Sequence, residues 1–488
     1  MHPILSKWRL APGQLLVLVL GLAAGQLLAA EPDLRISPDG TPQRLVLALD
    51  GIPYDVFADL QRQGYFAEFK PVARMVSTFP SLSDVAFAAI GGGEPPDGYQ
   101  VMRFDAGQNK VVGNTIGSLS SKAHPHLATD SKNYSSLHRM IGYMAAYHMA
   151  LSSMRRIGKD VLRSKKQTYV AYLEESDALL HIQGRPGAEK FLLQLDAFLI
   201  DLQSQARART GRELLVDIVS DHGSTMTKGE VVPIEQVLRD CGFRRRDRIV
   251  DAHDAAYSLA GIIGSVAITT LPGSAEEAAR CLAAADGVDL VAIDRGDVVG
   301  VRTADGEAEI RPAGDGAEAY EYRTLQGDPL HLAATTTAGA TNRFDEATMF
   351  AQTLDAARPD PLRRMWQAFH GDVKQPSPIL VSLADGREAG NAEVRTLAKI
   401  RGRAGTHGSM TRLASLGILA SNWREVDDVD TRGANESLFG ATTLSAMDKV
   451  MNDQTAAIAQ PVLGYPITPQ PVATSAPDGP EPKRGASP

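Results

Sequence analysis

Short apolar runs in the first half of the chain alternate with amphipathic helical patterns. The runs lie at residues 44–49, 72–76, 167–173 and 214–219, and the helical patterns between and around them at 54–64, 82–90, 134–161 and 186–209. The run at 214–219 is apolar at nearly every position, which is typical of a strand buried on both faces. Strands alternating with helices predict an α/β domain with a largely parallel central sheet.

The pattern changes after about residue 246. Short strand-like runs at 261–269, 290–293 and 298–301 surround one compact helix at 275–285, which predicts an inserted α+β subdomain, a cap, rather than more of the parallel sheet. The following segment, 335–370, is expected to be mostly helical. The predicted division is a first part of the catalytic α/β domain at 31–245, the cap at 246–375, a second catalytic part at 376–460, and a Pro/Ala-rich disordered tail at 461–488.

The N-terminus has the pattern of an export signal. Lys7 and Arg9 precede an apolar run at 15–24, and Ala29-Ala30 offer a cleavage zone, so residues 1–30 are predicted to be a signal peptide. Gln14 and Gln26 bound the run and make it a poor membrane span, although an uncleaved N-terminal anchor remains an alternative. Either way the body of the protein is expected to be exported, to a periplasm or to the outside of the cell.

Charge and cysteine content narrow the function classes. The 488 residues carry a net charge of −8, which argues against a nucleic-acid-binding surface. There are two cysteines, Cys241 and Cys281, too few for a thiolate metal site or a disulfide scaffold. One bond between them and two free thiols are both open.

Metal-ligating side chains gather at the predicted strand ends and in one glycine-flanked loop. Taken one at a time, each of these residues could have a purely structural role, in a turn, in a helix cap or in a surface pair. Together they supply six oxygen and imidazole ligands and one hydroxyl, a set that suits two Zn²⁺-like ions without cysteine. The residues are Asp50, Thr78 at the start of a helix, Asp177 and His181 four apart, adjacent Asp221 and His222, and His407 between glycines.

The order of these motifs resembles the alkaline phosphatase superfamily, with its nucleotide pyrophosphatase/phosphodiesterase branch the most similar. The motifs are strand-Asp50-Gly, Ser77-Thr78-Phe-Pro80, the stretch from Tyr172 to His181 containing Asp177, Ser220-Asp-His-Gly223 and Gly405-Thr-His-Gly408. The resemblance covers about 44–223 and 377–450. It implies a three-layer α/β sandwich with an inserted cap and two divalent metal ions, expected to be Zn²⁺.

The resemblance also implies roles for these residues. Asp50, Thr78, Asp221 and His222 would bind one ion, and Asp177, His181 and His407 the other. Thr78 would be the nucleophile and form a covalent phosphothreonine. Ser81 stands where the branch usually has an asparagine that contacts a phosphoryl oxygen, so Ser81 is a candidate substrate-binding residue and the substrate preference is open. The departure also leaves open that Ser83 takes part.

The expected activity is hydrolysis of a small-molecule phosphate ester, at a phosphodiester or pyrophosphate bond. Phosphomonoesters, phosphonates and sulfate esters are alternatives, because one scaffold serves all of them through different side pockets. A transferase that passes the group to an acceptor other than water is another. The alternative from a different class is a non-catalytic binding protein that keeps the metals.

Overall fold

A computed structural model describes most of the chain between residues 44 and 459. The described residues are 44–113, 127–131, 136–259, 262–314, 318–332, 339–390 and 404–459. The predicted signal peptide at 1–30 and the predicted disordered tail at 461–488 lie outside them.

A six-stranded sheet forms the centre of the first part of the molecule, the α/β part. Its order is β19-β2-β18-β6-β1-β5, and every strand is parallel to its neighbours except β18, which runs antiparallel to both β2 and β6. The strands are β1 Arg44–Leu49, β2 Ala73–Val76, β5 Thr168–Leu173, β6 Leu215–Ser220, β18 Leu416–Ser421 and β19 Val429–Asp430. The predicted α/β class with a largely parallel sheet is confirmed.

Alternate residues of β1 pack into two different apolar layers. Leu45, Leu47 and Leu49 face a core shared with one set of helices, whereas Val46 and Ala48 face a core on the opposite side. Because helices cover both faces of the sheet here, residues 45–49 of β1 all need to be apolar. The three-layer arrangement predicted from the sequence follows from this packing.

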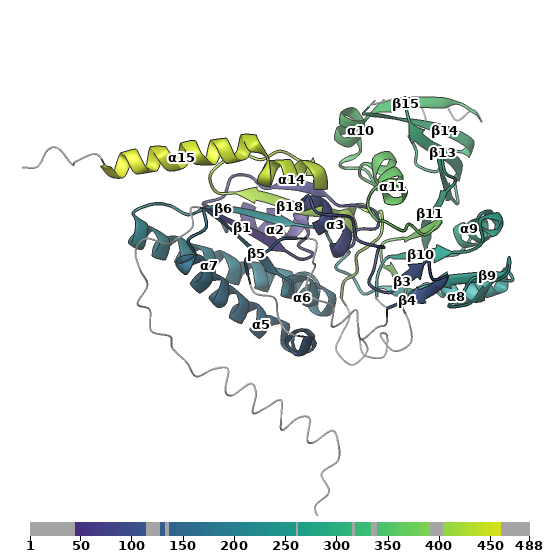
Figure 1. Cartoon of the computed structure of the whole chain (residues 1–488), viewed down its shortest axis with the longest axis horizontal. Helices are drawn as coiled ribbons and strands as arrows, with labels where there is room; N and C mark the ends of the chain where they lie inside the picture. Colours follow the sequence, from purple (N-terminus) through teal and green to yellow (C-terminus); the bar gives the residue numbers. More distant parts are fainter. Residues whose placement is uncertain are drawn as a thin grey trace, which may run out of the picture.

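The helices on the two faces come from different parts of the chain (Figure 1). On the face of Leu47 lie α2 Tyr54–Arg62, α5 Ser136–Arg163, α6 Glu175–Gln183 and α7 Arg185–Thr210. On the other side lie α3 Ser83–Ile90, α14 Thr431–Phe439 and α15 Ala441–Ala459. Within the part of the chain that the structure describes, no helix has both the length and the apolar character needed to cross a bilayer.

One buried ion pair lies inside the sheet. Arg44 Nε donates to Asp217 Oδ2 at 2.6 Å, and both side chains are fully buried. Trp423 Nε1 donates to the same carboxylate oxygen at 3.1 Å. A buried carboxylate needs such partners, since an unpaired charge in a sheet interior is strongly destabilising. The pair joins β1 to the middle of β6, the two strands that lead into the candidate site.

A nine-stranded, largely antiparallel sheet forms the second part of the molecule, seen on the other side of Figure 1 from the helices α5 and α7. Its order is β15-β14-β13-β12-β11-β16-β10-β9-β8. The strands are β8 Arg244–Arg245, β9 Asp254–Tyr257, β10 Ser265–Thr269, β11 Val288–Asp294, β12 Val299–Thr303, β13 Gly306–Pro312, β14 Ala319–Gly327, β15 Thr341–Asp345 and β16 Ile379–Leu383.

Strand β16 belongs to this second sheet, although the sequence division assigned residues 376–460 to the catalytic domain. It pairs antiparallel with β10 and with β11, and all five of its residues are buried. The second sheet therefore extends beyond residue 375, the predicted end of the cap. An isolated apolar run shows that a strand exists, but not which of two sheets it joins.

The segment predicted to be mostly helical, 335–370, contains a strand as well as helices. Its described part consists of β15, then α10 Glu346–Thr353 and α11 Pro361–His370. The strand alternates between exposed and partly exposed residues at the sheet edge, so it lacks the apolar signal of a buried strand.

The two cysteines form a disulfide bond between helices on one face of the second sheet. Cys241 directly follows α8 Ile234–Asp240, and Cys281 lies in α9 Ala275–Ala283. Both helices pack on β11 and β16 through a shared apolar cluster. Of the two possibilities that the sequence left open, the structure has the bonded one.

Removing this bond should lower the stability of the protein. The cross-link joins residues 40 apart in sequence, so chain entropy predicts a loss of about 3–4 kcal/mol in the free energy of unfolding for the Cys241→Ser/Cys281→Ser double variant. Urea unfolding measures it. Wild-type protein treated with reductant should match the variant, and the variant itself should not respond to reductant. A wild type that is equally stable with and without reductant would contradict the prediction.

Candidate metal centre

The parallel strands β5, β1 and β6 end at one edge of the sheet. Leu49 is in register with Leu173 and with Ser220, so the residues that follow these strands emerge side by side. Asp50 follows β1, Asp221 and His222 follow β6, and α6 begins after β5. This edge is where open α/β sheets bind ligands.

Asp50, Asp221 and His222 form one cluster, named here the inner group. One ligand atom from each lies within 4.8 Å of the others. His222 Nε2 is 3.5 Å from Asp50 Oδ1 and 3.4 Å from Asp221 Oδ2. The backbone N–H of Gly51 donates to the other oxygen of Asp221, at 3.0 Å. All three side chains are buried.

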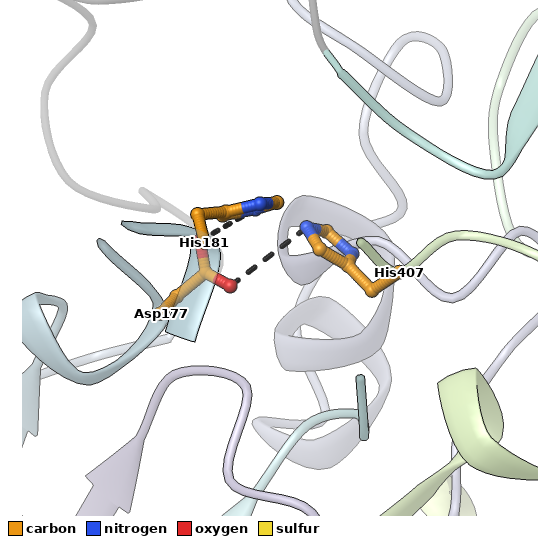
Figure 2. Close-up of side chains that lie close together, drawn as sticks. All are labelled: Asp177, His181 and His407. Atoms are coloured by element: carbon orange, nitrogen blue, oxygen red, sulfur yellow. Dashed lines mark ion pairs between the residues drawn. The ribbon is translucent and has the colours of Figure 1, made fainter. Parts of the chain in front are cut away.

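Asp177, His181 and His407 form a second cluster, the outer group (Figure 2). Asp177 and His181 lie one turn apart on α6, so both side chains leave the same face of the helix. His181 Nε2 is 3.2 Å from Asp177 Oδ2, and His407 Nε2 is 3.9 Å from Asp177 Oδ1. Asp177 and His181 are partly exposed, so the site opens to solvent on this side.

The two groups are immediate neighbours. The rings of His222 and His407 stack with centroids 3.9 Å apart. Gly51 lies between the groups with φ +70°, and a Cβ there would be 2.9 Å from Asp177 Oδ1 and 3.1 Å from His222 Cε1. A side chain at residue 51 would therefore push the two groups apart.

All three imidazoles are oriented by backbone carbonyl groups. His181 Nδ1 bonds to Gly405 O, His407 Nδ1 to Ser81 O, and His222 Nδ1 to Gly223 O, each at 2.9 Å. Because a carbonyl oxygen only accepts, each Nδ1 carries a proton, and Nε2 is the nitrogen turned toward the carboxylates. Metal-binding histidines are commonly held in this way.

The donor set of each group fits a divalent cation. Neutral imidazole nitrogens and carboxylate oxygens both present lone pairs, and a cation between them removes their mutual repulsion. Two ligands at about 2.1 Å from one tetrahedral ion lie about 3.4 Å apart, close to the separations of 3.4 and 3.5 Å in the inner group.

Without a cation, protons take over part of this role. Burial lowers the pKa of His181, but the Asp177 carboxylate and the Gly405 carbonyl outweigh it and raise the pKa to about 9. Burial and the neighbouring ring of His222 lower the pKa of His407 to about 3. Burial raises the pKa of Asp177, but His181 and the other rings bring it well below its usual range.

The six predicted ligands come together in these two groups, whereas the predicted nucleophile does not join them by a hydrogen bond. Thr78 is buried, and its hydroxyl donates to Pro80 O at 3.0 Å. Among the residues that the structure describes, no hydrogen bond joins this hydroxyl to a ligand of either group. Its carbonyl oxygen accepts from Arg364 Nη2 at 2.9 Å.

Ser81, the predicted substrate-binding residue, is fully buried. Its hydroxyl lies 3.2 Å from Thr78 O and 3.0 Å from Ser409 O, both of which only accept, and it receives Arg364 Nη2 at 3.2 Å. The hydroxyl is thus occupied within the protein. Through its carbonyl, which binds the His407 ring, Ser81 orients a ligand instead.

Two further residues lie at the site: Ser83, whose participation the sequence left open, and Tyr172, to which the sequence assigned no role. Ser83 Oγ donates to Asp50 Oδ1 at 3.0 Å and is 3.1 Å from His222 Nε2. Tyr172 donates its hydroxyl to the other oxygen of Asp50, and burial and that carboxylate raise the Tyr172 pKa well above its usual value, so it stays a donor. Tyr172 lies five residues before Asp177, and Ser83 is the first residue of the helix that follows Thr78. In the sequence, only this nearness to the motifs indicates that the two residues belong to the site.

Sequence comparisons find no relative: no family model and no curated protein matches the chain. Solved structures do match. Phosphonoacetate hydrolase from Sinorhizobium meliloti 1021, in complex with phosphonoformate, is 13% identical, covers 84% of this chain and 96% of its own, and superposes with a TM-score of 0.50. The chain has an alkaline-phosphatase-like fold.

Human ectonucleotide pyrophosphatase/phosphodiesterase 5 also matches, at 14% identity over 83% of this chain and 95% of its own, with a TM-score of 0.45. The fold that the motif resemblance implies is confirmed by the match to the phosphonoacetate hydrolase structure.

The metal affinity of the outer group should depend on pH through His181. Below a pKa of about 9 the ring is protonated, so a cation entering the outer group must displace a proton. The affinity for zinc should fall about tenfold for each unit of pH between about pH 8 and pH 6. Competition with a chelating dye measures it. The exposed His331 lies outside the site, and His331→Ala should keep the same slope; an affinity independent of pH would contradict the prediction.

Gly51→Ala should reduce metal binding, because its Cβ would displace Asp177 or His222. Gly64 provides a matched control: it also has positive φ, +96°, but no atom lies within 4 Å of a Cβ built there. Both variants should lose about 1–2 kcal/mol of stability from backbone strain, but only Gly51→Ala should bind less zinc by elemental analysis. Equal zinc content in both variants would refute this role for Gly51.

Proposed function

We propose that the protein is an exported, two-zinc hydrolase of small-molecule phosphate esters. The observation that carries the proposal is the pair of adjacent three-residue groups, with one imidazole Nε2 in the inner group and two in the outer group turned toward carboxylates. Zn²⁺ suits this mixture of nitrogen and oxygen ligands in which no cysteine takes part. The alkaline-phosphatase-like fold, which phosphonoacetate hydrolase also has, supports a phosphoryl hydrolase.

The residues of the site divide the work in this reaction. Asp50, Asp221 and His222 would hold one ion, and Asp177, His181 and His407 the other. Two bound dications would supply positive charge for the phosphoryl oxygens and for the leaving oxygen. Tyr172 holds Asp50 in place, and the carbonyls of Gly405, Ser81 and Gly223 keep the rings aimed at the site.

The covalent route passes the phosphoryl group first to a hydroxyl side chain and then to water. The sequence predicts Thr78 for this role, and the part-exposed Ser83 is a second hydroxyl near the ligands. For the substrate, the motifs favour a phosphodiester or pyrophosphate. Phosphonates are the main alternative, because the similar solved structure is that of a phosphonoacetate hydrolase.

Export is supported by the disulfide bond as well as by the N-terminal pattern. Bonds such as Cys241–Cys281 form and persist in oxidising compartments and are rare in a reducing cytosol. We therefore propose that the protein acts in a periplasm or outside the cell.

A panel of p-nitrophenyl esters tests the function. Zinc-loaded protein should hydrolyse bis(p-nitrophenyl) phosphate faster than the monoester, the phosphonate or the sulfate, as followed by release of p-nitrophenol. A chelator should abolish turnover, because the charge on the phosphoryl oxygens is then no longer offset. His181→Ala should lower kcat/KM by more than about 10²-fold, whereas His331→Ala should leave it unchanged.

The outcomes separate the alternatives. No turnover of any ester by the zinc-loaded protein would favour the non-catalytic binding protein. Phosphonate or monoester turnover far above diester turnover would keep the hydrolase but overturn the substrate. Product formation that needs an added alcohol would indicate the transferase.

A further inference from the structure

The Ser83 hydroxyl lies both at the N-terminus of helix α3 and next to the inner group. It could therefore reach a phosphoryl group bound at either place. It is the first residue of α3, and helix N-termini favour anions such as a phosphoryl group, because their first N–H groups have no partner within the helix. Its hydroxyl lies 3.0 Å from Asp50 Oδ1 and 3.1 Å from His222 Nε2, the two inner-group atoms that face each other.

This hydroxyl is not simply a helix cap. The N-cap of α3 is Leu82, which makes no side-chain capping bond, and Ser83 directs its side chain away from the backbone and toward the ligands. Ser83 is also partly exposed, so a substrate can reach it. A nucleophilic hydroxyl needs to lie close to the bound metal ions, whose positive charge favours its deprotonation, and it needs to be accessible to the substrate.

Thr78 lacks this access, and among the described residues no hydrogen bond joins its hydroxyl to either group. It is 5% exposed, its hydroxyl donates to Pro80 O, and its carbonyl is held by Arg364. Arg364 is itself buried and also donates to Ser81 Oγ and Ser415 Oγ. Thr78 thus belongs to a turn that Arg364 holds. The chain from Thr78 to Leu82 forms this turn, and the helix begins only at Ser83.

We propose that Ser83, rather than Thr78, is the nucleophile of the hydrolase. This assignment rests on the proposed function. In the first step the bond from Ser83 Oγ to phosphorus forms, the bond from phosphorus to the leaving oxygen breaks, and the leaving oxygen takes that electron pair together with the serine proton. In the second step water attacks phosphorus, the Oγ–phosphorus bond breaks, and a proton from water restores the hydroxyl.

Trapping of the covalent intermediate tests the assignment. Zinc-loaded wild-type protein is mixed with bis(p-nitrophenyl) phosphate and quenched in acid, and the tryptic peptide from Met75 to Arg103 is sequenced by mass spectrometry. Fragment ions that break the chain between Leu82 and Ser83 separate an adduct on Ser83 from one on Thr78. The adduct is expected on Ser83.

Variants give a second readout. Ser83→Ala should form no adduct and lose more than about 10³-fold in kcat, while its zinc content and melting temperature stay close to those of wild type. Thr78→Val keeps the shape of the threonine, and its adduct on Ser83 should persist. A loss of zinc from Ser83→Ala would show that Ser83 positions a metal ligand.

The results that overturn the assignment are distinct from those that overturn the function. Turnover with an adduct on Thr78, or turnover undiminished in Ser83→Ala that retains its zinc, would refute Ser83 and keep the hydrolase. No turnover and no adduct with any of the panel esters would refute the proposed function, and the assignment with it.

Discussion

Three hydrogen bonds from imidazole Nδ1 atoms to backbone carbonyls determine the rest of the site. They fix which nitrogen of His181, His222 and His407 faces the carboxylates. If one of these carbonyls moved, the ring it holds could rotate and present an N–H where a lone pair is needed. The carbonyls belong to three different backbone segments: Gly223 directly follows His222, Gly405 lies two residues before His407, and Ser81 is in the turn before α3. The site is therefore sensitive to how these segments pack against one another.

The sheet supplies the second constraint. β1 and β6 are in register along their whole length, and the buried Arg44–Asp217 pair joins them away from the site. A polar pair in the middle of an apolar sheet specifies register, because slipping by one residue would separate the two charges. Asp50 and Asp221 directly follow these strands. The Arg44–Asp217 ion pair therefore helps to fix their relative positions, although it lies several residues away from both.

The fold and the residues of the two groups, the candidate metal ligands, could be predicted from the sequence, because each depends on local patterns. Apolar runs ending in Asp50 and Asp221 identify parallel strands and the edge where their ends meet. Which hydroxyl lies next to these residues could not be decided from the sequence, because it depends on how the turn after Thr78 is held by Arg364, 286 residues further along the chain. The place of β16 in the second sheet depends likewise on its pairing with β10 and β11.

The unequal burial of the two groups has a kinetic consequence. The inner group is enclosed, whereas Asp177 and His181 in the outer group reach solvent. If both groups hold cations, the cation of the more exposed outer group would exchange with the medium before the one held by the buried Asp50, Asp221 and His222. A protein depleted slowly of metal would then pass through a state with a single ion, held by the two aspartates and the histidine that follow β1 and β6.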